Sequence, residues 1–108
     1  NAYIMSNIVM SKSYPQIVYL SMRGCPDCDA ATPIVYSEQI TAKADITQIE
    51  RDGYAEEDDV VDAYKIFQYV YGIDWYPSFL ILKPNNFNII GKTPIEMLEK
   101  TILETLQE

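Results

Sequence analysis

The side chains of this sequence that are best suited to chemistry are two cysteines, Cys25 and Cys28, which form a Cys-x-x-Cys motif. The apolar run at residues 17–20, typical of a buried strand, precedes them, and a helical pattern follows. Thiols three positions apart share one face of a first helical turn, so they can form and break a disulfide with little backbone movement. At that place the unpaired N–H groups and the dipole of the helix favour the thiolate form of Cys25.

Other uses of a single cysteine pair fit this sequence poorly. A tetrahedral zinc site takes four ligands, and a chain with two cysteines and no histidine leaves two positions unfilled unless it dimerises. A disulfide that closes a loop of two residues constrains little of the unfolded chain. We therefore expect a redox-active pair without metal or bound organic cofactor. The alternative is that both thiols are inert and only fill space near the start of a helix.

Composition and charge indicate one globular domain that avoids anionic partners. The 108 residues are 48% hydrophobic and 22% charged, which is enough for a single core, so we expect one domain over residues 1–108. The net charge of −8 would repel both nucleic acid and anionic membrane surfaces. Because no apolar run approaches the roughly 20 residues that cross a bilayer, we expect no stable membrane insertion by this segment.

The first residues carry an expectation about the compartment. Asn1 and Ala2 look like the remnant of a cleaved affinity tag, and the residue after them is Tyr3, not Met. An upstream signal peptide or membrane anchor is the usual reason for shortening an expressed chain. We therefore expect an extracytoplasmic protein, secreted or tethered to a membrane. The alternative is a full-length cytoplasmic chain that has lost only its Met.

Hydrophobic periodicity predicts the element order α-β-α-β-α-β-β-α. Helices are expected over 3–12, 25–42, 56–71 and from 93 onward, and strands over 16–22, 45–50, 78–82 and 87–90. Pro33 should kink the second helix, because its ring removes a hydrogen bond and clashes with the preceding turn. Strands separated by helices should pair in parallel, and the last two should form an antiparallel hairpin. The expected fold is α/β, with a mixed sheet of about four strands flanked by helices.

Two motifs in this framework resemble the thioredoxin superfamily. The spacing of Cys25, Cys28 and Pro33 is similar to that of the family's active-site helix, in which a kinking proline follows the first cysteine at the same interval. The stretch 71–78, which contains Gly72 and Pro77, resembles the segment that leads into the family's cis-proline. The resemblance covers about residues 4–107. It implies a thioredoxin-like three-layer fold in which the family's first strand is not visible.

The resemblance also implies an activity and a division of roles. Cys25 would be the exposed nucleophile and Cys28 the buried resolving thiol of a thiol–disulfide oxidoreductase, which acts on protein disulfides by dithiol–disulfide exchange. Pro77 would be cis, leaving the backbone of Tyr76 free to pair with an extended substrate segment. Trp75 and Tyr76 would shape the docking surface beside it. We expect a monomer whose partners are protein thiols or disulfides.

The sequence departs from the family pattern around the motif. Thioredoxins usually have Trp before the first cysteine and Gly-Pro between the two, where this chain has Gly24 and Pro26-Asp27. The buried acid that thioredoxins carry six residues before the first cysteine is Tyr19 here. The Asp27 carboxylate should oppose a neighbouring thiolate and stabilise the disulfide, unless the Arg23 side chain folds over the site and cancels the effect. We expect Pro26, Asp27 and Arg23 to tune the pair.

The sequence does not decide which kind of thioredoxin-like protein this chain resembles. Small members of the superfamily include exported oxidoreductases and bacteriocin-accessory proteins of Gram-positive bacteria, and this chain looks similar to them. The alternative to an enzyme is therefore a thioredoxin-like accessory or binding module. Such a module would serve one dedicated partner, for example in bacteriocin production or export, with a regulatory cysteine pair. The direction of electron flow is also undetermined.

Overall fold

The computed structural model describes residues 15–54, 56 and 62–108. The predicted helix over 3–12 and residues 57–61 of the predicted helix over 56–71 lie outside the described residues. The elements are β1 (Gln16–Arg23), α2 (Pro26–Val35), α3 (Glu38–Thr41), β2 (Asp45–Asp52), α4 (Asp62–Val70), β3 (Ser78–Leu82), β4 (Phe87–Gly91) and α5 (Ile95–Gln107). No helix of the described part has the length and apolar character needed to cross a membrane.

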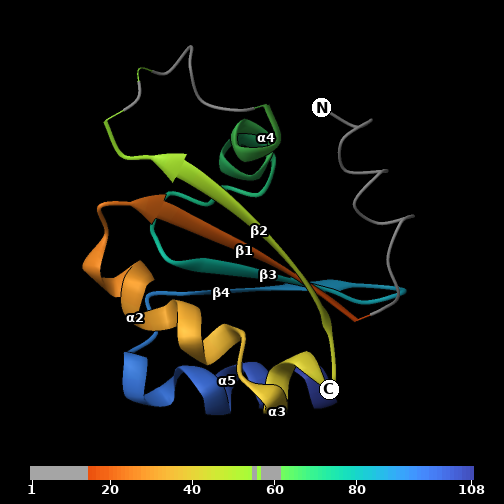
Figure 1. The fold of residues 1–108 in the computed structure, drawn as a ribbon. Helices are drawn as coiled ribbons and strands as arrows, with labels where there is room; N and C mark the ends of the chain where they lie inside the picture. The colour runs from red at the N-terminus through yellow and green to blue at the C-terminus, as the bar shows by residue number, and fades with distance from the viewer. Residues whose placement is uncertain (1–14, 55, 57–61) are drawn as a thin grey trace.

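The sheet has four strands in the order β2-β1-β3-β4, so β1 and β3 are central. β1 pairs with β2 in parallel and with β3 antiparallel, and β3 pairs with β4 antiparallel. Helices α2, α3 and α5 cover one face of the sheet, and α4 covers the other (Figure 1). The predicted three-layer α/β architecture with a mixed sheet is confirmed.

The prediction that strands separated by helices pair in parallel is right for β1 with β2 and wrong for β3. β3 lies beside β1 in the opposite direction, with Ser78 opposite Leu20. The reason is that α4 crosses the strands rather than running back along them (Figure 1). The connection after α4 therefore delivers the chain to the end of the sheet where β1 ends. β3 starts at that end, which brings its first residues close to the cysteine motif.

The predicted single helix over 25–42 is in fact two helices. α2 ends at Val35, and α3 begins at Glu38 after an extended Ser37 with φ −65° and ψ 156°. The N–H of Ser37 bonds the Ile34 carbonyl, which tightens the last turn of α2, and the Ser37 carbonyl then accepts the N–H of Ile40. Pro33 lies inside α2, close to its end, so the helix stops soon after the proline instead of continuing through a kink.

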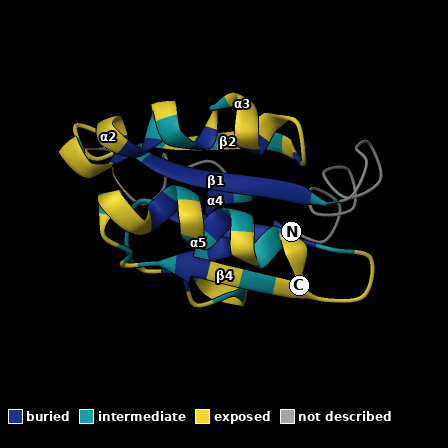
Figure 2. Ribbon diagram, turned by 90° about the horizontal axis from the view of Figure 1, so that it is seen from below, coloured by how far each residue is buried: buried dark blue, intermediate teal, exposed yellow. Residues whose placement is uncertain are grey.

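Two apolar clusters form the core, one on each face of the sheet. Alternate side chains of β1 and β3 point to opposite faces, and both strands are buried along nearly their whole length. Figure 2 shows this burial along β1. The cluster under α2, α3 and α5 is Ile17, Tyr19, Ala31, Val35, Ile40, Ala44, Phe79, Ile81, Ile90, Leu98 and Ile102. The cluster under α4 is Val18, Leu20, Tyr64, Phe67, Ile73, Leu80 and Leu82. Val70, the last residue of α4, is exposed.

Candidate redox-active site

Cys25 is the residue that caps the N-terminus of α2. β1 ends at Arg23, and Gly24 turns the chain with φ +82°, a left-handed conformation that glycine adopts without the penalty of a Cβ. Cys25 is extended, and its Sγ accepts a hydrogen bond from the N–H of Cys28 at 3.1 Å. Pro26 occupies the first helical position, where a missing N–H costs nothing. The Cys25 sulfur therefore faces the N–H groups at the helix start.

Cys28 lies one turn further along and is enclosed by the protein. Both thiols are free, but Cys25 is half-buried whereas Cys28 is only 2% exposed. Burial, reinforced by the hydrogen bond with the Cys25 thiol, raises the pKa of Cys28 to about 12, and a backbone hydrogen bond from Met22 acts in the opposite direction. The structure thus brings together one accessible thiol at the helix start and one buried thiol behind it.

Tyr19 lies directly beneath this helix turn. Its hydroxyl donates to the Cys28 carbonyl at 2.8 Å and lies 3.0 Å from the Thr32 hydroxyl, which contacts the same carbonyl at 3.0 Å. Its ring stacks on Phe79, with centroids 5.0 Å apart. Burial raises the pKa of Tyr19 to about 12, so the hydroxyl is neutral at physiological pH. The sequence showed Tyr19 only as a departure from the family pattern, and its fixed distance from Cys25 along the chain was the available signal.

The segment before β3 forms the wall next to the cysteine motif. The Tyr76–Pro77 peptide bond is cis. Trp75, Tyr76 and Pro77 line a cavity of about 410 Å³ together with Asp27. The remaining lining residues come from β3, β4, the β4–α5 connection and α5, and they are Phe79, Ile90, Gly91, Lys92, Thr93, Pro94, Ile95 and Leu98. The predicted substrate-binding residues therefore share one cavity with Asp27, while the Cys25 side chain lies outside its lining.

The Trp75 side chain is held by the end of β4, which sequence reasoning did not connect with it. A Cβ added to Gly91 would lie 1.4 Å from Trp75 Nε1, so only glycine allows the indole to pack there. The ammonium group of Lys92 lies 4.5 Å from the ring centroid, within the range of a cation–π contact. The Tyr76 ring lies near that of Tyr64 on α4. The two neighbouring aromatic side chains of the cavity lining thus pack against different elements, Trp75 against the end of β4 and Tyr76 against α4.

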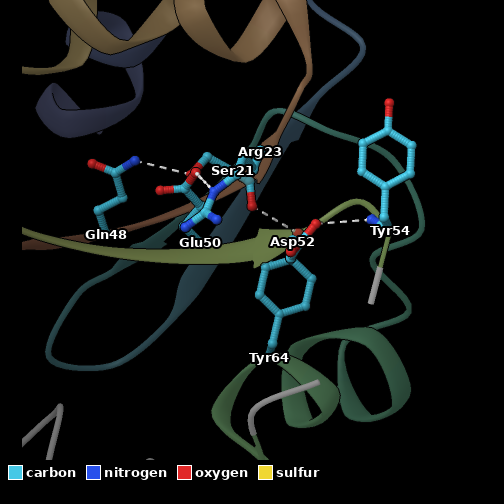
Figure 3. A network of polar contacts seen from close by, with 7 residues as sticks. All are labelled: Ser21, Arg23, Gln48, Glu50, Asp52, Tyr54 and Tyr64. Atoms are coloured by element: carbon cyan, nitrogen blue, oxygen red, sulfur yellow. Dashed lines mark hydrogen bonds and ion pairs between the residues drawn. The ribbon is translucent and has the colours of Figure 1, made fainter. Parts of the chain in front are cut away.

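Arg23 does not fold over the cysteine motif. Its Nε lies 3.8 Å from Oε1 of Glu50 on β2, and both side chains are largely exposed, so the ion pair contributes little stability. Figure 3 shows Arg23 directed toward β2, whereas Asp27 lines the cavity near Pro77. The structure does not bring the two charges together, and the expected cancellation of Asp27 by Arg23 has no support in this arrangement.

A polar network fixes the ends of the strands that carry the motif (Figure 3). The Ser21 hydroxyl accepts a hydrogen bond from Gln48 Nε2 at 2.9 Å, and the Ser21 carbonyl accepts one from the Tyr64 hydroxyl at 3.1 Å. These bonds join β1 to β2 and to α4. Beyond β2, the N–H of Tyr54 bonds Asp52 Oδ1 at 3.0 Å. The end of β1, which leads into the Gly24 turn, is therefore hydrogen-bonded both to β2 and to α4.

Comparison with known proteins gives the fold. No protein-family model and no curated protein matches the sequence. The crystal structure of thioredoxin from Aeropyrum pernix matches with a TM-score of 0.61 and 16% identity, covering 84% of this chain and 74% of that one. The solution structure of a thioredoxin from Thermus thermophilus matches with a TM-score of 0.58 and 14% identity, covering 96% and 78%. The chain therefore has a thioredoxin-like fold, in which Cys25 and Cys28 form a Cys-x-x-Cys pair.

Proposed function

We propose that this protein is a thiol–disulfide oxidoreductase that acts on protein disulfides through Cys25 and Cys28. The observation that carries the proposal is the asymmetry of the pair: Cys25 is accessible at a helix N-terminus, and Cys28 is buried next to it. An N–H group that donates to the sulfur stabilises the thiolate, which is the form that attacks disulfides. Two thiols that merely filled space would not need this difference in access.

The exchange follows from this arrangement in two steps. The Cys25 thiolate attacks one sulfur of a substrate disulfide, forming a mixed disulfide and releasing the other substrate sulfur as a thiolate. Cys28 then attacks Cys25 Sγ, so that the Cys25–Cys28 disulfide forms and the remaining substrate sulfur leaves. The hydrogen bond from the Cys28 N–H to Cys25 Sγ shows that the two residues already lie in contact. The same steps run in reverse when the pair oxidises a substrate.

The cavity next to Pro77 supports a docking site for the substrate segment. Its inner wall is apolar, formed by Phe79, Ile90 and Leu98, all of which are buried. Its rim carries the Trp75 indole and the Lys92 ammonium group. We infer that an apolar side chain near the substrate cysteine enters this cavity while the cysteine itself reaches Cys25. Pairing of the substrate backbone with the segment at Tyr76 would hold it in an extended form.

The experiment that tests the proposal is stoichiometric exchange with insulin. Reduced protein is mixed with insulin, and samples of the reaction are quenched with acid at intervals. The remaining thiols are alkylated with iodoacetamide, and the mass of the protein is measured by mass spectrometry. We expect the wild-type protein to lose the Cys25 thiol first, as a mixed disulfide with insulin, and the Cys28 thiol afterwards as the internal disulfide forms, whereas the Cys25→Ser variant retains its thiol. Wild-type protein that keeps both thiols after prolonged incubation would contradict the proposal. The accessory module with one dedicated partner would then be the better description.

A further inference from the structure

Within the described residues, the hydroxyl groups that bond backbone carbonyls at and near Cys28 are neutral and already engaged. From β1, the Tyr19 hydroxyl donates to the Cys28 carbonyl at 2.8 Å, and from α2 the Thr32 hydroxyl does so at 3.0 Å. From α4, the Tyr64 hydroxyl donates to the Ser21 carbonyl at 3.1 Å. Tyr19 and Tyr64 are fully buried. None of these groups is a base that could take a proton from a thiol at neutral pH.

The charged groups near Cys28 do not supply a base either. The exposed carboxylate of Asp29, the next residue on α2, acts against a thiolate at Cys28 by like-charge repulsion. Asp27 lines the cavity beside Pro77, and Arg51 of β2 exerts its positive charge on Tyr64. The Cys25 thiol, which contacts Cys28, is consumed once a mixed disulfide has formed on it. Within the described residues, the proton of Cys28 therefore has no buried carboxylate or imidazole to go to.

We propose that the attack of Cys28 is the slow step of the exchange at neutral pH, so that the protein holds its partner as a long-lived mixed disulfide on Cys25. Tyr19 is the positioning residue for this behaviour. Fast attack would need a proton acceptor in the buried position beneath Cys28, and that position holds the Tyr19 hydroxyl, which is neutral and already hydrogen-bonded. The inference rests on the proposed function and deepens it: the partner is a protein with a reactive disulfide, and the site is built to retain it.

The step balances without an oxidant or a metal. The Cys28 S–H loses its proton to solvent, and the resulting electron pair attacks Cys25 Sγ. The bond between Cys25 Sγ and the partner sulfur breaks, its electron pair leaves on the partner, and the partner thiolate takes a proton from solvent. One disulfide replaces another. Burial, the largest cause that raises the pKa of Cys28, persists when Cys25 carries the partner, so the reactive thiolate is a minor species at pH 7 and its fraction rises with pH.

The experiment follows the reaction of reduced protein with one equivalent of 5,5′-dithiobis(2-nitrobenzoate) by stopped flow between pH 7 and 10. The first release of thionitrobenzoate reports the mixed disulfide on Cys25, and the second reports the attack of Cys28. We expect a second release that is independent of protein concentration, slower than the first at pH 7 and about tenfold faster for each pH unit without a plateau. A second release that is fast at pH 7, or a plateau below pH 9, would overturn the inference while leaving the proposed function intact. If even the first release failed, both would fall.

Variants at Tyr19 test its part in this behaviour. Tyr19→Phe keeps the ring that stacks on Phe79, and we expect its second release to stay within about threefold of wild type with the same slope. Tyr19→Glu should accelerate the second release at pH 7 by about tenfold or more and introduce a plateau, because a carboxylate can take the proton. Tyr19→His tests the same point if the glutamate variant does not fold. A Tyr19→Phe protein that loses its pH dependence, or a folded acceptor variant with the wild-type profile, would refute the role of Tyr19.

Discussion

The sharpest consequence of the buried thiol is a loss of stability in alkali that depends on Cys28. Its pKa is raised from 9.0 to about 12 in the folded protein, so folding favours the neutral thiol. Below pH 9 both the folded and the unfolded chain carry the proton, and the full stability is present. Above pH 9 the unfolded chain loses the proton while the folded one keeps it. Stability therefore falls through the window between pH 9 and 12.

The size of the effect follows from the same values. At pH 10 the unfolded chain is above its thiol pKa and the folded chain is below, which costs on the order of 1 kcal/mol of unfolding free energy relative to pH 7. Replacing Cys28 by alanine removes this contribution. It retains Tyr19 and Tyr64, whose pKa values burial also raises, so their contributions cancel in the comparison.

The assay is urea unfolding of the reduced protein at pH 7 and pH 10, followed by the fluorescence of Trp75 in the presence of a phosphine reductant. We expect wild type to lose on the order of 1 kcal/mol more than Cys28→Ala between the two pH values. Equal losses in the two proteins would show that Cys28 ionises as easily in the folded as in the unfolded chain. The division between an accessible and an enclosed thiol would then be wrong.

Three further predictions concern the surroundings of the pair. Asp27→Asn removes a like charge near the Cys25 thiolate, so a glutathione titration should show a more oxidising Cys25–Cys28 couple. The reduction potential should rise by about 30 mV for each 1.4 kcal/mol by which the substitution stabilises the reduced pair relative to the disulfide. An unchanged potential would mean that solvent already screens the carboxylate. Cys28→Ser should capture protein disulfides as stable mixed disulfides on denaturing gels and Cys25→Ser almost none, whereas equal capture would indicate equivalent thiols. Gly91→Ala should displace the Trp75 indole, lowering the thermal midpoint and shifting the emission spectrum, and wild-type values for both would contradict the packing found here.

The local elements were within reach of the sequence because each depends on residues close together in the chain. The apolar run at 17–20 is buried on both faces, as a central strand must be. The turn residues at 84–86 separate two strands that do pair antiparallel as a hairpin. The position of Cys25 at a strand-to-helix junction is likewise a local property, and the N-cap conformation of Cys25 agrees with it.

The arrangement around the thiols was decided by contacts between distant parts of the chain. The direction of β3, the packing of Trp75 on Gly91 and the pairing of Arg23 with Glu50 each join segments that local patterns do not relate. Tyr19 shows the difference most clearly. Its place in a buried strand follows from hydrophobic periodicity. Its hydroxyl reaches the Cys28 carbonyl only because α2 packs on the same face of the sheet as the Tyr19 side chain, with Cys28 above it. Hydrophobic pattern specifies which face a side chain takes, whereas the partner it meets there depends on how the helices and strands are packed against one another.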